Sequence, residues 1–419
     1  LFIFMTLFLK KYQYQLLLMA TGISSLLILC GLLDIHLQTI IFPDAGNYNE
    51  SATNLYWFQR GHCYRPILMA SIYGFPLLFG ASDQDLYGIA TYINILLWLF
   101  SIILLFEIIQ YYVSKRIAFW LSFLFVFFIG ITLFNFHLLA EIPFLFFLIS
   151  SFYFLQKYSQ TKVLKWLVIA LSILVLSMLI KPGSKFFAIL LLFYFSKILF
   201  LHFKQKVMLL LYASILLCFV QAAGLKYQFG DFTISYIDNV TFHNYLFSKA
   251  DCYRKGIEYK QLDNPRAEYL FTKKVHEQKK IAKEDILEQI QNNKINLIKA
   301  YFHNFTWNSL SGNIVVKTYS NLSNSPSYSK IQHVLYWISK YQNRMMTIFG
   351  IVLSLLTLLK YYRKDFFLFF TALLVLYIIG ISGISSDQGD RFHIITYPFT
   401  LILLANYLKT KPFFAPPQK

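Results

Sequence analysis

Residues 87–110 read YGIATYINILLWLFSIILLFEIIQ and hold a single charged residue, Glu107. A helix rises about 1.5 Å per residue, so this run is long enough to cross a hydrocarbon layer of about 30 Å. A backbone in lipid must satisfy its own hydrogen bonds, and a helix does so within one segment. The run therefore predicts a membrane-spanning α-helix.

Similar apolar runs recur along the 419 residues, and the composition agrees with them. The chain is 57% hydrophobic and 14% charged, with a mean hydropathy of +0.53, whereas a soluble domain carries about 25% charged residues. We predict an all-α membrane protein with about 10 transmembrane helices. The candidate spans lie approximately at 14–33, 87–110, 117–134, 138–156, 163–180, 185–201, 207–224, 345–360, 365–383 and 392–408.

The net charge of +18 is explained by membrane topology and not by a nucleic-acid partner. With the N-terminus in the cytoplasm, every inside segment carries at least two basic residues, whereas the short outside segments are poorer in them. An even number of spans places both termini on the cytoplasmic side. The inside clusters are Lys10–Lys11, Lys115–Arg116, Lys157 with Lys162 and Lys165, Lys204 with Lys206, Lys360 with Arg363 and Lys364, and Lys409 with Lys411.

Two outside segments are long, and they set the expected domain organisation. Residues 1–224 form an N-terminal module of about seven spans that includes the outer loop 34–86. Residues 225–344 form a large outer loop, and 345–419 a C-terminal module of about three spans. Within the large loop, 266–300 has the apolar spacing of an amphipathic helix. We expect the two loops to form one helical layer over the membrane helices, with the chemistry on that side.

Polar residues gather at the outer ends of the predicted spans. These are the positions at which a membrane enzyme can meet both a lipid and a soluble substrate. The stretches are FPDAGNYNESA at 42–52, GHCYRP at 61–66, HLLAEIP at 137–143, IKPGSK at 180–185 and SDQGDRFH at 386–393.

The order of these stretches resembles the GT-C glycosyltransferases. An Asp soon after the first span, followed by Tyr48 in a small-residue helix, resembles the superfamily as a whole. Arg65-Pro66, Glu141-Ile142-Pro143 and Gly389–His393 resemble its bacterial members in the protein mannosyltransferase and lipid A aminoarabinose transferase group. The motifs span most of the chain, and each is short. Lys181-Pro182 stands where relatives often have Arg-Pro, which changes the geometry of phosphate binding.

The resemblance implies transfer, with inversion, of a sugar from a polyprenyl phosphate or diphosphate to an acceptor hydroxyl. A phosphate leaves as a stable anion and needs no general acid, so one carboxylate acting as base suffices. Asp44 is the candidate base; its alternative role is to cap the helix from Ala45. The leaving phosphate needs cations, and the candidates are Lys181, Arg391, Arg65 and Lys185.

Seven further polar residues are candidates for binding substrate. Glu141 could orient a sugar or simply complement the dipole at a helix start. His62 and His137 could equally be structural residues whose hydrogen bonds are satisfied within the protein. The set is Glu141, Tyr48, His62, His137, Asp387, Asp390 and His393. No His, Cys and Asp grouping has the spacing of a metal site, although a divalent ion between Asp44 and the phosphate, as in some GT-C relatives, stays open.

The four cysteines divide between spans and loops. Cys30 and Cys218 fall inside predicted spans, where they fill space as small apolar residues. Cys63 and Cys252 both fall in outer loops, where an oxidising compartment permits a bridge between them.

The sequence favours an extracytoplasmic glycosyltransferase of the bacterial inner membrane. Its partners would be a polyprenyl-linked sugar, the lipid bilayer, and a glycan, lipid or protein acceptor. An O-antigen polymerase or ligase is the main alternative, and it would not need Asp44. A flippase or transporter is a further one, but it usually carries ionisable residues near mid-membrane, whereas Glu107 lies near the inner end of its span. Neither the sugar nor the acceptor is determined.

Overall fold

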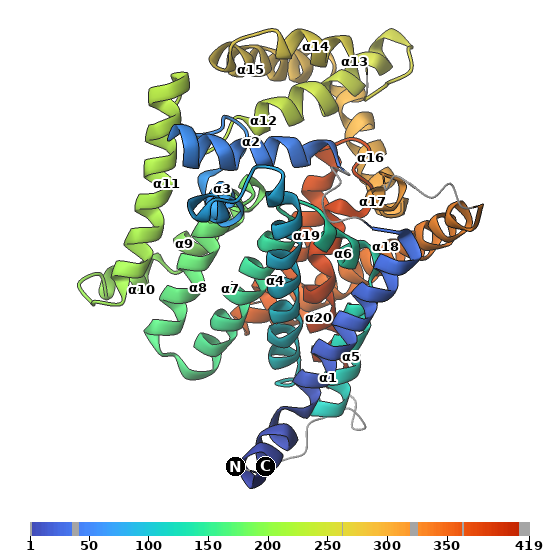
Figure 1. Cartoon of the computed structure of the whole chain (residues 1–419). Helices are drawn as coiled ribbons and strands as arrows, with labels where there is room; N and C mark the ends of the chain where they lie inside the picture. The colour runs from blue at the N-terminus through green and yellow to red at the C-terminus, as the bar shows by residue number, and fades with distance from the viewer. Residues whose placement is uncertain (1, 36–41, 262, 319–325, 363, 410–419) are drawn as a thin grey trace.

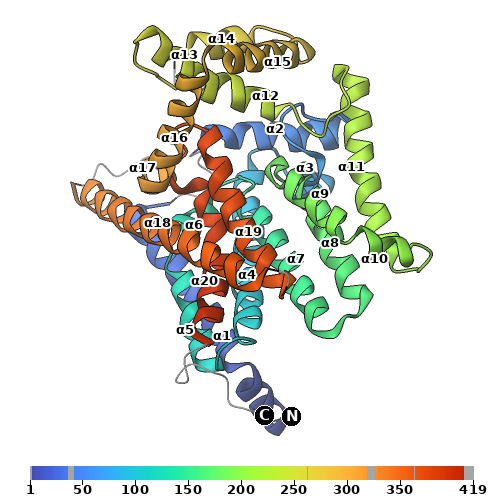
Figure 2. The same ribbon diagram turned by 180° about the vertical axis from the view of Figure 1, so that it is seen from behind.

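The computed structural model describes residues 2–35, 42–261, 263–318, 326–362 and 364–409, and these contain helices and no strand (Figures 1 and 2). The all-α fold class is therefore confirmed. The helices of the bundle are α1 (Phe2–Leu33), α4 (Asp85–Ile109), α5 (Lys115–Val126), α6 (Ile129–Leu133), α7 (Glu141–Thr161), α8 (Leu164–Ser177), α9 (Lys185–Tyr194), α10 (Ser196–Leu201), α11 (Met208–Phe229), α18 (Pro326–Tyr361), α19 (Phe366–Ile381) and α20 (Tyr397–Lys409).

Five helices in the described ranges are long and apolar enough to cross a membrane, and the bent pair α5–α6 makes a sixth if it counts as one span. The chain is thus a multi-pass membrane protein. The count of about ten spans is not confirmed, because several predicted runs form short helices: α8 has 14 residues, α20 has 13 and α9 has 10. The five are α1 from Lys10, α4, α11, α18 from Tyr328, and α19.

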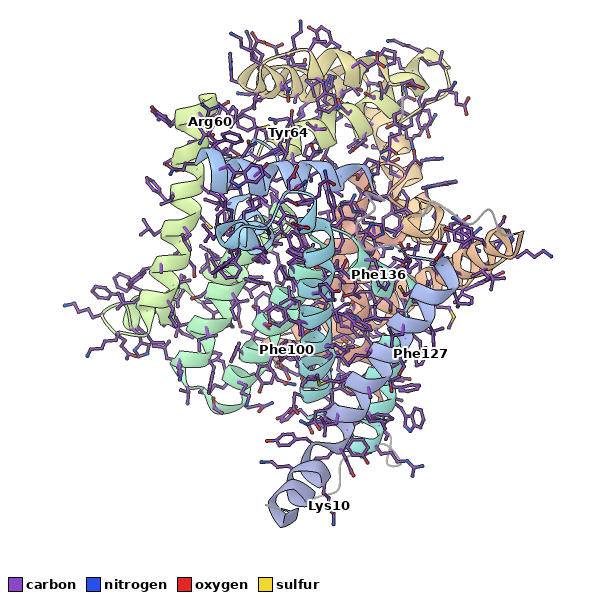
Figure 3. All side chains as sticks on the ribbon, in the orientation of Figure 1. Lys10, Arg60, Tyr64, Phe100, Phe127 and Phe136 are labelled. Atoms are coloured by element: carbon purple, nitrogen blue, oxygen red, sulfur yellow. The ribbon has the colours of Figure 1, made fainter. Side chains whose placement is uncertain are left out.

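Large apolar side chains lie on the outside of the bundle. Phe100 of α4 is 52% exposed and Phe127, after α5, is 44% exposed (Figure 3). In water such a surface would favour association, but in a bilayer it contacts lipid tails of the same polarity. The exposed aromatic residues therefore follow from the membrane environment that the composition predicts.

The break between α5 and α6 bends that segment by 60°. A break inside lipid frees backbone groups, which must find new partners. Gln342 of α18 supplies them, because its amide oxygen accepts from the Ile129 N–H at 3.0 Å and its amide N–H donates to the Phe127 carbonyl at 2.8 Å. One side chain thus satisfies both sides of the bend.

The turns between α4 and α5 and between α7 and α8 lie at the end of the bundle away from the α12–α15 group (Figure 1). Lys115 begins α5 and Lys162 follows α7, so these basic residues belong to those turns. Lys409 ends α20 at the same level, since its ammonium lies over the rings of Tyr111 and Tyr112 beyond α4, at 5.7 and 5.8 Å. The basic clusters therefore share one end of the bundle, although which side of the membrane that end faces stays a prediction.

The large loop folds into a layer of helices over the other end of the bundle (Figure 1). A small core of Leu246, Phe247, Ala250 and Ala300 holds its helices together. The expected single amphipathic helix over 266–300 is wrong, because breaks at 272–274 and 293 divide it into three. The layer comprises α12 (Ile237–Val240), the π-helix η4 (Thr241–Phe247), α13 (Ser248–Lys255), α14 (Pro265–Phe271), α15 (Val275–Asn292) and α16 (Lys294–Leu310), followed by α17 (Ile314–Thr318).

The first outer loop is also helical, and it carries the site. Its helix α2 (Pro43–Phe58) lies across the end of the bundle, beneath the layer (Figure 1). Pro43 suits the first turn because a helix does not need the N–H that proline lacks. Next come α3 (Ile67–Gly74) and the short helix η1 (Phe75–Phe79). The division of the chain into 1–224, 225–344 and 345–419 stays a prediction.

We expect Gly130→Ala to destabilise the bundle. A Cβ there would lie deep inside van der Waals contact with the Asp390 carboxylate and 3.1 Å from the Asn313 amide nitrogen. Overpacking of this kind costs roughly 1–3 kcal/mol, and thermal unfolding in detergent measures it. Gly224→Ala in α11 is the control, since a Cβ there meets nothing within 4 Å. Equal melting temperatures for the two variants would contradict the packing described here.

Candidate functional site

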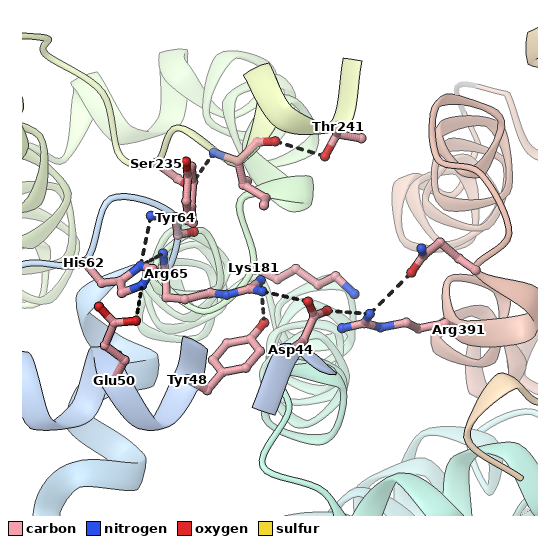
Figure 4. A network of polar contacts seen from close by, with 12 residues as sticks. Asp44, Tyr48, Glu50, His62, Tyr64, Arg65, Lys181, Ser235, Thr241 and Arg391 are labelled. Atoms are coloured by element: carbon pink, nitrogen blue, oxygen red, sulfur yellow. Dashed lines mark hydrogen bonds and ion pairs between the residues drawn. The ribbon is translucent and has the colours of Figure 1, made fainter. Parts of the chain in front are cut away.

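The Asp44 carboxylate lies between two arginines (Figure 4). Its Oδ1 accepts from Arg65 Nη2 at 3.0 Å, and its Oδ2 accepts from Arg391 Nη1 at 2.7 Å. The three residues come from α2, from the loop before α3, and from η6 (Gly389–Arg391) near the C-terminal end of the chain. Three distant stretches of sequence therefore meet at one carboxylate, as the outer-end pattern predicts.

Glu141 is the second carboxylate of the site. Its Oε1 accepts from Lys181 Nζ at 2.9 Å and from Arg391 Nε at 2.5 Å, and its side chain is 1% exposed. Three cations and two carboxylates leave the group of Asp44, Arg65, Glu141, Lys181 and Arg391 with one net positive charge. We call these five residues the cationic cluster. A buried group of this sign attracts an anion.

An aromatic ring lies against each of the three cations. The Arg65 guanidinium lies 4.4 Å from the Tyr48 ring centroid, and the Arg391 guanidinium 4.9 Å from the Phe42 centroid. Lys181 Nζ lies 5.0 Å from the Phe392 centroid. Such contacts favour a cation where water is scarce and fix the plane of a guanidinium. Tyr48 therefore supports Arg65 from within the site.

Asp44 does not cap its helix. The N-cap of α2 is Phe42, and no side-chain hydrogen bond caps the first turn. Burial alone would raise the pKa of Asp44, but the charges of Arg391 and Arg65 outweigh it and hold the pKa well below its usual value. The capping role is therefore wrong, and the group is an ionised carboxylate, 31% exposed, with a guanidinium on each oxygen.

The loop that carries Arg65 is fixed by the outer layer. Tyr64 donates its hydroxyl to Gln278 of α15 at 2.7 Å, and its carbonyl accepts from the Ser235 hydroxyl at 2.8 Å. Within the loop, His62 Nδ1 accepts from the backbone N–H groups of Tyr64 and Arg65 at 3.1 and 3.2 Å. His62 thus shapes the turn and does not face Asp44, and burial lowers its pKa to about 4.

The loop that carries Arg391 is fixed by α16. Asn308, fully buried, donates its amide to the carbonyls of Ser382 and Ser385 at 2.9 and 2.8 Å and accepts from the Gln388 N–H at 3.0 Å. Gln388 in turn accepts from Arg391 Nη1 at 3.3 Å. Both arginines on Asp44 are therefore held in place by helices of the large loop.

An apolar pocket adjoins the cluster on the membrane side. It lies between α7, α19 and the short helix η7 (His393–Thr396), and Lys181 forms part of its wall. Its volume of about 20 Å³ is too small for a hydrocarbon chain, so it places Lys181 beside an apolar surface and does not form a binding pocket for a lipid tail. The apolar lining includes Phe144, Leu374, Ile378, Ile381 and Ile395.

Two of the predicted site residues lie close to the cluster but outside it. Lys185, a candidate for the donor phosphate, forms an ion pair with Asp238 of α12. His137 is 2% exposed and packs edge-on against Phe42, at 6.3 Å between ring centroids. The structure therefore brings together three of the four predicted cations with Asp44 and leaves Lys185 at the edge of the outer layer.

The residues of the stretch 386–393, before the last predicted span, lie in different surroundings. Asp390 is buried and accepts from the Asn313 amide at 3.0 and 3.3 Å, on the side of α6 and away from Asp44. His393 contacts the hydroxyls of Thr347 and Ser382 at 2.8 and 2.9 Å, inside the bundle. Asp387 follows Ser386, whose hydroxyl donates to the Asn304 side chain of α16 at 3.1 Å. Of this motif, Arg391 alone belongs to the cluster.

Three residues that contribute to the site were not among the candidates predicted from the sequence. Gln388 lies in a quoted stretch but was not singled out. Phe42 supports Arg391. Tyr245 of η4 lies close enough to Asp44 that burial and then that charge raise the pKa of its phenol. No local pattern marks Tyr245, because its place in the site depends on how the large loop packs over α2.

The structure bears on the predicted disulfide and on the possibility of a metal ion. All four cysteines, Cys30, Cys63, Cys218 and Cys252, are free thiols in the structure, so the bridge between the two outer loops is not formed. Within the ranges that the structure describes, no group of three or more His, Cys, Asp or Glu residues could hold a metal ion. The oxygens of Asp44 are occupied by guanidinium groups.

Comparisons with known proteins add one distant structural likeness. No family model and no curated protein sequence matches the chain. Among solved structures, the archaeal oligosaccharyltransferase AglB from Archaeoglobus fulgidus, in complex with an inhibitory peptide and a dolichol-phosphate, is similar with a TM-score of 0.44 and 10% identity over 96% of this chain. The chain spans 50% of the length of that protein. At this level of similarity, the activity of the chain must be inferred from its own residues.

We expect Asp390→Asn to remove a pH dependence of stability. Burial raises the pKa of Asp390 to about 7, while the hydrogen bond from Asn313 opposes this in part. A carboxyl whose pKa is raised on folding stabilises the fold below its unfolded pKa, and that stability is lost as pH rises toward 7. As the pH rises from 4 to 8 in detergent, the melting temperature of the parent should therefore fall relative to that of Asp390→Asn. Parallel curves would show that Asp390 titrates normally.

Proposed function

We propose that the protein is a GT-C-type glycosyltransferase that moves a sugar from a polyprenyl-linked phosphate or diphosphate to an acceptor hydroxyl. The observation that carries this proposal is the cationic cluster, in which Arg65 and Arg391 pair with the partly exposed Asp44 while Lys181 pairs with the buried Glu141. The cations suit the phosphate, and Asp44 suits the reacting hydroxyl. The motif order that resembles this superfamily supports the same reading.

The leaving group determines which residues the reaction needs. As the bond between the sugar C1 and the phosphate oxygen breaks, negative charge accumulates on the phosphate. Arg65, Lys181 and Arg391 are positioned to stabilise this charge in a site with little water, where electrostatic stabilisation is strongest. Arginine can grip a phosphate with two parallel hydrogen bonds, whereas Lys181 acts as a point charge.

Asp44 acts as the base once the donor has bound. In the free site both of its oxygens are engaged by guanidiniums, so its pKa is low and it is a weak base. A phosphate competes for the same N–H groups and draws Arg65 and Arg391 away. The pKa of Asp44 then rises toward its ordinary value, and one oxygen is free to accept the proton of the acceptor hydroxyl. The oxygen of that hydroxyl attacks the sugar C1 on the face opposite the phosphate, so the configuration at C1 is inverted.

The proposed setting is the bacterial inner membrane, with the outer layer on the periplasmic side. The basic helix ends opposite that layer support this orientation under the positive-inside rule. The bacterial protein mannosyltransferase and lipid A aminoarabinose transferase group is the proposed kinship, on the motifs alone. The donor would enter laterally from the bilayer.

We expect Asp44→Asn to lower sugar transfer by about a hundredfold or more, as the loss of a general base does. The assay uses membranes that contain the full chain and a panel of radiolabelled polyprenyl-linked sugars. Asp83→Asn is the matched control, because it removes a partly exposed carboxylate from the same outer loop. Transfer at the parental rate by a folded Asp44→Asn would overturn Asp44 as base and favour a polymerase or ligase. Absence of transfer from every donor would reject the glycosyltransferase proposal.

Lys181→Gln should raise the donor KM roughly tenfold or more, since it removes a charge-assisted contact to the phosphate. Lys185→Gln should change it little, because the Lys185 ammonium pairs with Asp238. The two lysines are four residues apart, and each variant loses one positive charge. The two variants therefore change the long-range electrostatic potential at the site almost equally. Initial rates at several donor concentrations separate them, and an equal rise in KM for both would place the phosphate elsewhere.

A further inference from the structure

Two N–H groups at the centre of the Arg65 loop share one acceptor. Residues 59–66 connect α2 to α3 without a helical turn, so their N–H groups need partners outside a helix. Those of Tyr64 and Arg65 both donate to Nδ1 of His62, at 3.1 and 3.2 Å (Figure 4). Pro66 follows, and a proline restricts the residue before it to an extended backbone. Arg65 is therefore held out of helical geometry, and the His62 ring supplies the acceptor that a helix would provide.

This contact determines where the proton of His62 lies. A ring nitrogen that accepts hydrogen bonds carries no hydrogen, so the hydrogen of the neutral imidazole must be on Nε2. Nε2 lies 3.7 Å from the Oε2 atom of Glu50, which belongs to α2. A carboxylate on that side favours the tautomer with its hydrogen on Nε2. Glu50 thus favours the form of His62 in which Nδ1 can hold the loop.

The backbone that His62 holds carries the guanidinium of Arg65. Its Nη2 lies 3.0 Å from Asp44 Oδ1, and its plane lies 4.4 Å from the Tyr48 ring centroid. The Nε–H of Arg65 is buried and has no acceptor among the residues that the structure describes. Buried donors seldom lack a partner, and a phosphate oxygen is a strong acceptor for an arginine N–H. Arg65 is therefore held in place with one donor left for a ligand.

We propose that His62 is a positioning residue for the donor phosphate. In its Nε2–H form it fixes the backbone of Tyr64 and Arg65 and so keeps the free Nε–H of Arg65 directed toward the phosphate. This inference rests on the proposed function and adds to it a residue that touches neither the sugar nor the phosphate. His62 acts through Arg65, because its two hydrogen bonds go to the backbone of the loop.

Two substitutions separate the two nitrogens of the ring. The Oδ1 atom of asparagine, like Nδ1 of histidine, is two bonds beyond Cβ, so His62→Asn keeps an acceptor at the position of Nδ1. The amide of glutamine is three bonds beyond Cβ, at the position of Nε2, so His62→Gln keeps a polar group but displaces the acceptor. A role that depends on Nδ1 is therefore retained by asparagine and lost with glutamine.

Amide hydrogen exchange tests the backbone contact without any substrate. The full chain in nanodiscs is transferred to D₂O, and mass spectrometry with fragmentation resolves the amides of Tyr64 and Arg65. We expect His62→Gln to speed their exchange by about tenfold, because each amide loses a hydrogen bond, and His62→Asn to keep the parental rate. His276→Gln, at an exposed position of α15, is the control. Equal exchange in the parent and His62→Gln would overturn the contact.

Binding of decaprenyl phosphate tests the consequence at the site. We expect His62→Gln to weaken the affinity of the nanodisc-embedded chain for radiolabelled decaprenyl phosphate by about tenfold, since Arg65 loses its fixed position. His62→Asn should restore the parental affinity. A histidine that only helps the chain to fold would change the number of binding sites and leave their affinity as it is. No binding by the parent, an unchanged affinity in His62→Gln, or no recovery in His62→Asn would contradict the proposal.

These measurements also separate the inference from the proposed function. Neither of them needs sugar transfer, so phosphate binding that depends on His62 supports the positioning role even if every donor fails in the transfer assay. In a working transfer assay, His62→Gln should raise the donor KM by about the factor by which it weakens phosphate binding. A parental donor KM in that variant would overturn the positioning role and leave Asp44 as base unaffected.

Discussion

The shared carboxylate of Asp44 is the constraint on which the site depends. Two guanidiniums from opposite ends of the chain approach each other only because Asp44 lies between them at 3.0 and 2.7 Å. Without that charge, Arg65 and Arg391 would repel each other in surroundings that screen poorly. Glu141 does the same for Lys181 and Arg391. The alternating order of charges therefore fixes α2, the Arg65 loop and the Arg391 loop as one unit.

The outer layer has a larger role than covering this unit. Through Tyr64 it holds the Arg65 loop, and through Asn308 it holds the Arg391 loop. A change in the packing of α15 or α16 would therefore move a guanidinium on Asp44.

The surroundings of the site differ in polarity. Apolar side chains of α7 and α19 lie beside Lys181, whereas the cationic cluster carries one net positive charge. Charged groups are costly inside the bilayer and gather where its apolar core ends.

The sequence by itself determined the all-α membrane class, because long apolar runs have no other stable form in lipid. It also placed Asp44, Arg65, Lys181, Glu141 and Arg391 at one end of the bundle, since outer ends of spans share a side. Tertiary structure decided which of these residues touch, and it set apart Lys185, Asp390 and His393. The reason is that one helical turn or one strained residue redirects a side chain, as at Asp387. Helix breaks and the packing of the large loop, which place Tyr245, depend on distant contacts that no local pattern records.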